Sequence, residues 1–299
     1  GQGRRYGTPN RRGDPRCVQG VIRGYVRDCM NQTLTSLQAK RARSPFDPRM
    51  SRRSFVAAGL TALTAPSLLG CLERSNEVRD GDPRLTARPH TPSEPFTTGA
   101  SQVGLEFERD ALLYVPQSYS PDVAAPLLVA LHGAGGSGGD WSGLYDDCEA
   151  RGMVMLAPDS RSSTWDRISG QFAGDVWFLD AALSFTFDRC AIDAAHIALG
   201  GFSDGASYTL SLGVSNGDLF THLIAFSPGL MAPAEPLVGK PRIFVSHGTQ
   251  DPILSVAASR DRIVPALRED GYDVTYEEFV GGHQVPRVVS QQALDWFLG

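Results

Sequence analysis

Five continuous apolar runs, each ended by turn residues, constrain the fold of this 299-residue chain more than any other feature of its sequence. The runs are residues 126–131, 153–157, 196–200, 222–226 and 242–246. Unbroken apolar segments of this length are typical of strands buried on both faces of a parallel sheet. Helix-like stretches alternate with them, at residues 140–151, 172–187, 204–214, 255–270 and 285–298. The alternation predicts a doubly wound, mostly parallel α/β sheet with helices on both faces.

Shorter segments complete this domain, which we place at residues 99–299. Residues 103–108 and 111–116 alternate apolar and polar side chains and predict a hairpin that turns near Arg109 and Asp110. Residues 274–279 predict a final strand. In sheets of this kind the chemistry gathers beyond the carboxyl ends of the strands, so we expect the functional side chains to follow the strands.

Charge sets the first part of the chain apart. Residues 1–53 hold thirteen Arg and Lys side chains against three acidic ones, a balance of +10, whereas residues 54–299 carry −15. The acidic bulk is a poor partner for nucleic acid, because such binding requires phosphate neutralisation. Residues 1–49 show no apolar periodicity, and we interpret them as a disordered basic extension, upstream of a start at Met50 or dispensable. A nucleic-acid-binding arm is the alternative, but aromatic residues do not interleave the basic ones.

Residues 50–71 have the pattern of an export signal. Arg52 and Arg53 precede Phe55, and a 16-residue apolar stretch then ends at Gly70, shorter than the ~20 residues of a membrane span. The segment resembles a twin-arginine signal, and Leu68-Leu69-Gly70-Cys71 resembles a bacterial lipoprotein box with Cys71 as the lipidated residue. We therefore expect an exported protein, periplasmic, membrane-anchored or secreted. Residues 72–98, rich in Pro, Thr and Ser, predict a flexible linker.

Three serines occupy the centre of a G-x-S-x-G pattern, and context separates them. Ser203 has a predicted strand before it and a predicted helix after it, the setting of a nucleophile on a tight strand-to-helix turn. Ser215 lies at a predicted helix end, and Ser137 lies in a loose glycine-rich loop. We identify Ser203 as the candidate nucleophile.

A serine hydroxyl needs a base and an orienting carboxylate. His283, which follows two glycines in the turn after the last strand, is the candidate base, and Asp251, just past the strand at 242–246, is the candidate acid. The order Ser203, Asp251, His283 is the one expected for α/β-hydrolases. Backbone N–H groups of Ala134, in the loop 132–136, and of Asp204 are the candidate oxyanion donors.

Other features bear on substrate and stability. The segment between the predicted strands at 222–226 and 242–246 is too short for a large lid. Trp165, in the loop 158–171 that we expect to flank the cleft, is a candidate substrate contact. Cys148 and Cys190 either form a disulfide or remain two buried thiols. We find no metal-ligand spacing and no cofactor motif.

The motifs L-H-G-A-G-G, G-F-S-D-G, H-G-T-Q-D-P and G-H-Q-V-P resemble those of the α/β-hydrolase superfamily over residues 99–299. The nearer resemblance is to the phospholipase/carboxylesterase and dienelactone-hydrolase-like group and to polyhydroxybutyrate-depolymerase and feruloyl-esterase relatives. It implies an α/β-hydrolase fold with Ser203, His283 and Asp251 as the triad. Asp204 departs from that pattern, because relatives often carry Gln, Asn or Ala there.

The sequence thus predicts a serine carboxylic-ester hydrolase that acts on small-molecule or lipid-like esters with short or medium acyl groups. A thioesterase or a peptidase would use the same triad, because all three reactions are acyl transfers. An inactive exported binding lipoprotein is an alternative from another class, and it would be expected to lack a triad member. The oligomeric state cannot be read from the sequence.

Overall fold

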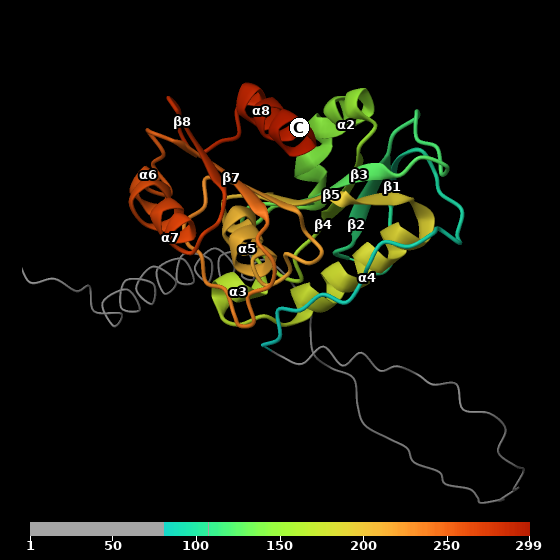
Figure 1. The fold of residues 1–299 in the computed structure, drawn as a ribbon, viewed down its shortest axis with the longest axis horizontal. Coiled ribbons are helices and arrows are strands. Elements are labelled where there is room, and N and C mark those ends of the chain that lie inside the picture. The colour runs from blue at the N-terminus through green and yellow to red at the C-terminus, as the bar shows by residue number, and fades with distance from the viewer. Residues whose placement is uncertain (1–80, 107) are drawn as a thin grey trace, which may run out of the picture. The chain divides into compact units, whose positions relative to one another are not determined.

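The computed structural model describes residues 81–106 and 108–299. The basic extension, the signal segment with Cys71 and the first part of the predicted linker lie outside the described residues. An eight-stranded sheet forms the centre (Figure 1). The strands are β1 (Gly99–Gln102), β2 (Ala111–Val115), β3 (Ala125–Leu131), β4 (Val154–Pro158), β5 (Ile192–Phe202), β6 (His222–Phe226), β7 (Arg242–Gly248) and β8 (Val274–Phe279).

Helical segments connect these strands. They are η1 (Gly138–Leu144), α2 (Tyr145–Arg151), α3 (Asp166–Ser169), α4 (Gly174–Arg189), α5 (Asp204–Gly213), α6 (Val256–Ala258), η2 (Ser259–Ile263), α7 (Val264–Glu269) and α8 (Arg287–Leu298). All five predicted helical stretches are present, whereas the short α3 was not predicted. Within the described part of the chain, no helix is long and apolar enough to cross a membrane.

The strands lie in the order β1-β2-β4-β3-β5-β6-β7-β8. β1 pairs antiparallel with β2, and β2 pairs antiparallel with β4, while every pair from β4 to β8 is parallel. The predicted hairpin exists, but its first strand is residues 99–102 rather than 103–108. Gly104 has φ +80°, and Asp110 accepts the N–H groups of Gly104 and Leu105, so the chain turns there instead of pairing.

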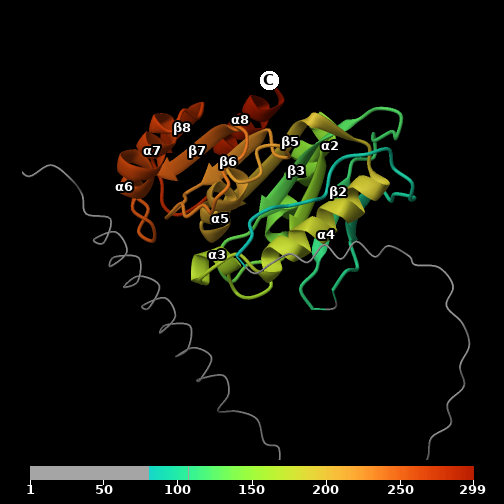
Figure 2. The ribbon, with the colours of Figure 1, turned by 60° about the horizontal axis from the view of Figure 1, so that its bottom comes forward.

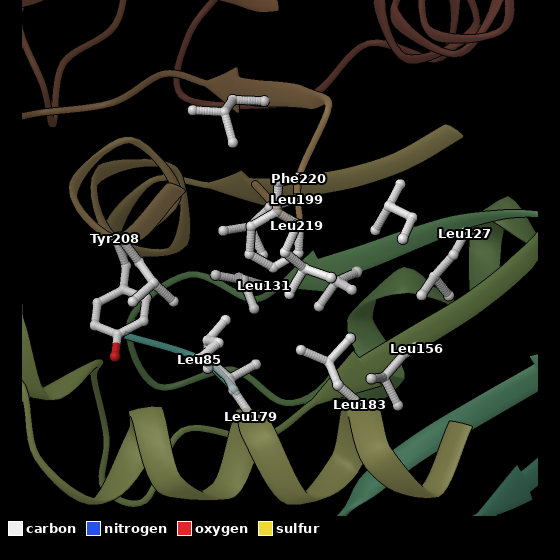
Figure 3. Close-up of a cluster of buried hydrophobic side chains, with 14 of the residues drawn as sticks. Leu85, Leu127, Leu131, Leu156, Leu179, Leu183, Leu199, Tyr208, Leu219 and Phe220 are labelled. Atoms are coloured by element: carbon white, nitrogen blue, oxygen red, sulfur yellow. The ribbon is translucent and has the colours of Figure 1, made fainter. Parts of the chain in front are cut away.

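Each face of the sheet has its own hydrophobic core. Along β3, Leu127, Val129 and Leu131 belong to one core, whereas Leu128 and Ala130 belong to the other. α4 and α5 pack on the first face and α2 and α8 on the second, as two views show (Figures 1 and 2). In the first core, Leu179 and Leu183 of α4 point toward side chains of the sheet (Figure 3). Because each face of the sheet is covered by helices, side chains on both sides of a strand are buried, and the strand sequence is an unbroken apolar run.

Residues 81–98 correct one prediction. This segment is not a flexible linker, because it packs against the domain, with Leu85 only 1% exposed. The N–H of Leu85 donates to Asn216 Oδ1, and Asn216 Nδ2 donates to the carbonyl of Pro83. Arg84 and Arg88 both pair with Asp218. A composition rich in Pro and Thr predicts a linker, but the contacts that order this segment are made by residues more than a hundred positions away.

Candidate active site

Ser203 lies on a sharp turn between β5 and α5. Its φ of 57° and ψ of −117° are unfavourable for a residue with a side chain, a strain of about 1–3 kcal/mol in comparable sites. The turn is held by backbone bonds, because the Ser203 N–H donates to the Phe226 carbonyl at 2.9 Å and the Ser203 carbonyl accepts from Ser207 N–H at 3.0 Å. The strained turn projects the hydroxyl from the carboxyl end of the sheet.

The glycines around Ser203 are required by close packing. A Cβ on Gly205 would lie 2.3 Å from the Leu131 carbonyl oxygen and 2.5 Å from that of His132. A Cβ on Gly201 would lie 2.4 Å from the backbone of Gly205. These approaches show that the β5–α5 turn has no room for a side chain at either glycine. Ser137 instead precedes η1, and the buried Ser215 donates to the carbonyl of Ala234.

The structure brings Ser203, His283 and Asp251 together. His283 Nε2 lies 2.8 Å from Ser203 Oγ, and His283 Nδ1 lies 2.6 Å from Asp251 Oδ2. The Phe202 ring packs against the imidazole, with centroids 4.7 Å apart. β5, β7 and β8 end at the same edge of the sheet, so their following loops deliver the three side chains to one place.

Asp251 is buried and hydrogen-bonded on both oxygens. Its Oδ1 accepts the N–H groups of Ile253 and Leu254, and its Oδ2 faces His283 Nδ1. Burial alone would raise the pKa of this carboxyl, but the hydrogen bonds from His283 and from the two backbone N–H groups outweigh it and lower the pKa. The carboxylate therefore stays ionised beside the imidazole and fixes a hydrogen on His283 Nδ1, which leaves Nε2 to accept a proton from Ser203.

Backbone N–H groups of Ala134 and Asp204 lie on the two segments next to Ser203. Among the described residues, neither N–H donates to another protein group, so both are available to an oxyanion. The loop is close to the nucleophile, since a Cβ on Gly133 would lie 3.4 Å from Ser203 Cβ. The Asp204 carboxylate accepts a hydrogen bond from Thr164 Oγ1 at 2.6 Å, which gives its charge a partner.

His132 anchors the loop of residues 132–136, which carries Ala134. Its buried ring accepts from the Ser160 N–H at Nε2, 2.9 Å away, and donates from Nδ1 to the Gly133 carbonyl at 2.6 Å. Burial lowers the pKa of His132, and the nearby Arg109 guanidinium lowers it further. Arg109 also donates to the Gly136 carbonyl in the same loop, a brace that sequence analysis missed because only its long-range contacts reveal it.

Trp165 does not face the cleft, which corrects its prediction as a substrate contact. Its side chain is fully buried, its indole N–H donates to the His132 carbonyl at 2.9 Å, and its ring stacks on Tyr208 with centroids 5.2 Å apart. The residue therefore supports the loop of Ala134 from inside the domain. Cys148 and Cys190 are free and buried rather than paired, and burial raises the pKa of both thiols to about 12.

A cavity of about 290 Å³ is lined by residues next to the triad in the chain or in space, but by none of the three triad residues themselves. Apolar walls come from Trp141, Leu144, Phe202 and Val285, and Gly133 and Phe202 connect the cavity to the surroundings of Ser203. Arg287 and Asp140 add one charge of each sign to the lining. A cavity of this size and composition suits a small, mostly apolar group. In the part of the chain that the structure describes, no group of three His, Cys, Asp or Glu residues is arranged to hold a metal ion.

Comparison with solved structures identifies the fold. An acetyl xylan esterase from Aspergillus awamori superposes with a TM-score of 0.54 at 16% identity, covering 67% of this chain and 99% of that one. Esterase PE8 superposes with a TM-score of 0.52 at 22% identity, covering 64% of this chain and 98% of that one. The chain has the α/β-hydrolase fold.

Sequence comparison finds curated relatives of this chain. It is 27% identical over 169 residues to feruloyl esterase C of Emericella nidulans, a match that covers 53% of this chain and 60% of the relative. It is 30% identical over 118 residues to feruloyl esterase B of Thermothelomyces thermophilus, covering 36% and 40%. The chain thus spans only about half the length of the curated relatives it matches. No protein-family model matches the chain.

Proposed function

We propose that this α/β-hydrolase is a carboxylic-ester hydrolase that acts through Ser203, His283 and Asp251 and forms an acyl-enzyme on Ser203. The observation that carries the proposal is the unbroken chain of contacts from Asp251 Oδ2 to His283 Nδ1 at 2.6 Å and from His283 Nε2 to Ser203 Oγ at 2.8 Å. The similarity to proteins named as esterases supports the same bond type.

The reaction follows from this geometry. His283 Nε2 takes the hydroxyl proton as Ser203 Oγ attacks the ester carbonyl, and Asp251 stabilises the imidazolium. The negative oxygen of the tetrahedral intermediate accepts from the N–H groups of Ala134 and Asp204, each worth roughly 2.7–4 kcal/mol of barrier in related sites. His283 then protonates the leaving alcohol. Water, deprotonated by His283, attacks the acyl-enzyme, and collapse of the second intermediate releases the acid and restores Ser203.

The cavity beside Phe202 supports short or medium acyl groups as substrates. Its apolar walls would hold an acyl chain or ring next to the carbonyl carbon, and its volume limits the length. No helix or strand forms over residues 227–241, so the cleft has no large cover from that segment. The curated relatives are named feruloyl esterases, so a feruloyl ester is one candidate for a substrate panel.

Replacement of the nucleophile tests this proposal. Ser203→Ala is expected to lower kcat for p-nitrophenyl acetate and butyrate by about 10⁴-fold or more, since removal of a triad member leaves only oxyanion and binding contributions. Ser137→Ala and Ser215→Ala, in the other two copies of the pattern, are matched controls that should retain activity. Full activity in a folded Ser203→Ala variant would refute the assignment. A separate comparison of the parent protein on matched ester, thioester and amide substrates defines the preferred bond.

Export remains part of this proposal. The twin-arginine-like and lipoprotein-like segment at residues 50–71 supports attachment to a membrane through Cys71 or release outside the cytoplasm. Globomycin treatment of a bacterial host that expresses the full chain tests the lipid anchor, because it blocks the signal peptidase specific for lipoproteins. Accumulation of the uncleaved form is expected, and unchanged processing would contradict lipidation of Cys71.

A further inference from the structure

A second histidine faces the triad carboxylate. His247, near the end of β7, is fully buried, and its Nε2 lies 2.8 Å from the Leu254 carbonyl oxygen and 3.3 Å from Asp251 Oδ2. Its Nδ1 lies 2.8 Å from the hydroxyl of Ser259, which is also fully buried. The proposed reaction uses neither His247 nor Ser259.

The contacts determine where the hydrogen of His247 lies. A carbonyl oxygen can only accept, so Nε2 carries a hydrogen, which it donates to the Leu254 carbonyl, and Asp251 Oδ2 lies 3.3 Å from the same nitrogen. The Ser259 hydroxyl holds the other ring nitrogen. The imidazole is therefore fixed from both sides, and its partly positive Nε2–H edge lies 3.3 Å from the same carboxylate oxygen that contacts His283.

The same contacts close the turn that carries Asp251. The N–H of Leu254 donates to Asp251 Oδ1 at 2.9 Å, and the carbonyl of Leu254 accepts from His247. Asp251 Oδ1 thus depends on a turn that His247 ties to β7, while Oδ2 lies between two imidazoles. Rotation of the carboxylate would break contacts on both oxygens.

We propose that His247, held by Ser259, is a positioning residue that fixes the Asp251 carboxylate for His283 and shares its negative charge. The inference rests on the proposed function, because a role for Asp251 orientation presupposes the triad. Unlike Ser203 and His283, His247 does not touch substrate or the reacting atoms.

The charged surroundings of His247 are few. Asp251 lies in the loop after its strand, and His283 lies across that carboxylate. On the neighbouring strand, Glu278 is the register partner of His247, and Arg260 in η2 pairs with Glu278. Glu278 has its own cationic partner in Arg260, and the carboxylate in contact with His247 Nε2 is that of Asp251, 3.3 Å away.

Loss of His247 should therefore change both rate and pH dependence. In His247→Leu we expect kcat for p-nitrophenyl butyrate to fall roughly 10- to 100-fold with KM within twofold, because only orientation is lost. The negative charge of Asp251, no longer shared, then acts on His283 alone, so the midpoint of the acid limb of the kcat/KM profile should rise by about half a pH unit. Ser259→Ala should move it in the same direction by less.

Two further variants make the test specific. His247→Gln, whose amide N–H replaces Nε2–H, should recover most of the rate and restore the acid limb. His222→Leu removes another buried histidine, which packs against Trp296 at the opposite end of a neighbouring strand, and should leave the profile unchanged. If His247→Leu does not fold, as judged by its circular dichroism and melting curve, Ser259→Ala and His247→Gln carry the comparison.

The outcomes separate the two proposals. An acid limb that stays in place or moves to lower pH in the folded His247 and Ser259 variants overturns the positioning role, whatever the loss of rate. A parent protein that neither hydrolyses esters nor reacts with a fluorophosphonate at Ser203 overturns the proposed function itself. Active parent protein with an unshifted His247→Leu profile refutes the positioning role alone.

Discussion

The turn that carries Ser203 and the loop that precedes α4 are stabilised in opposite ways. The turn from β5 to α5 is held by backbone contacts and by glycines that admit no Cβ. The loop from β4 to α4 is held by side chains: Asp166 Oδ2 accepts the N–H of Asp175, and Asp175 Oδ2 accepts the N–H of Asp166. The comparison shows that a local, backbone-determined feature can be read from a short motif, whereas a loop built on reciprocal side-chain contacts cannot.

The largest effect should come from filling the space at the β5–α5 turn. Gly205→Ala puts a methyl group 2.3 Å from a backbone oxygen of β3, which cannot move without disturbing the sheet. We expect loss of the native fold or of all esterase activity, with a destabilisation of about 3 kcal/mol or more. Urea unfolding and ester turnover measure the two effects.

Gly139→Ala is the matched control for this substitution. A Cβ there meets only the Ser137 hydroxyl at 3.4 Å, so both stability and activity should stay close to those of the parent. An active, stable Gly205→Ala variant would show that the turn has room to relax and that its backbone packing does not determine the site.

An intermediate effect is expected from the side-chain support of the second segment. Trp165→Phe keeps an aromatic ring of smaller size and removes the N–H that donates to the His132 carbonyl. The loop of Ala134 should lose part of its orientation, so kcat should fall about tenfold while KM changes less than twofold. A rise in KM with unchanged kcat would instead indicate that Trp165 contacts substrate, as sequence analysis had suggested.

The smallest effect is a pH-dependent one in the same loop. Burial raises the pKa of Asp175 to about 6. The hydrogen bond from the Arg161 N–H lowers this pKa, and the negative charge of Asp166 raises it. Because the folded pKa lies above the unfolded one, the stabilisation from this group is present below about pH 4 and is lost as the pH rises through 6.

Asp175→Asn should remove that dependence. The free energy of unfolding of the parent minus that of the variant is expected to decrease between pH 4 and pH 7, by on the order of 2 kcal/mol. Urea titrations at several pH values measure it. Asp122→Asn, in an exposed turn, is the control whose difference from the parent should not vary, and a constant difference for Asp175→Asn would contradict the account.

The prediction from sequence succeeded where the signal was local or followed from topology. Ser203, Asp251 and His283 each follow a parallel strand, and parallel strands end at one edge, so their convergence could be inferred without coordinates. What distinguishes Ser203 from Ser137 and Ser215 is its place between a strand and a helix, which the sequence pattern already indicates.

It failed where distant residues decide the structure. Leu85 is buried because Asn216 and its neighbours provide a place for it, and Trp165 faces the core because the His132 carbonyl and Tyr208 lie there. His247 and Asp251 are only four positions apart in the sequence, yet their contact depends on Ser259 and on the turn at Leu254. Neither composition nor spacing specifies such partners.

The central claim is that the strained turn presents Ser203 as an activated nucleophile. Its most direct test is reaction of the purified protein with a fluorophosphonate, followed by intact-mass measurement and peptide mapping. We expect one adduct per chain, located on Ser203, absent in Ser203→Ala and strongly slowed in His283→Ala. An adduct on another serine, or no adduct on folded protein, would contradict the account.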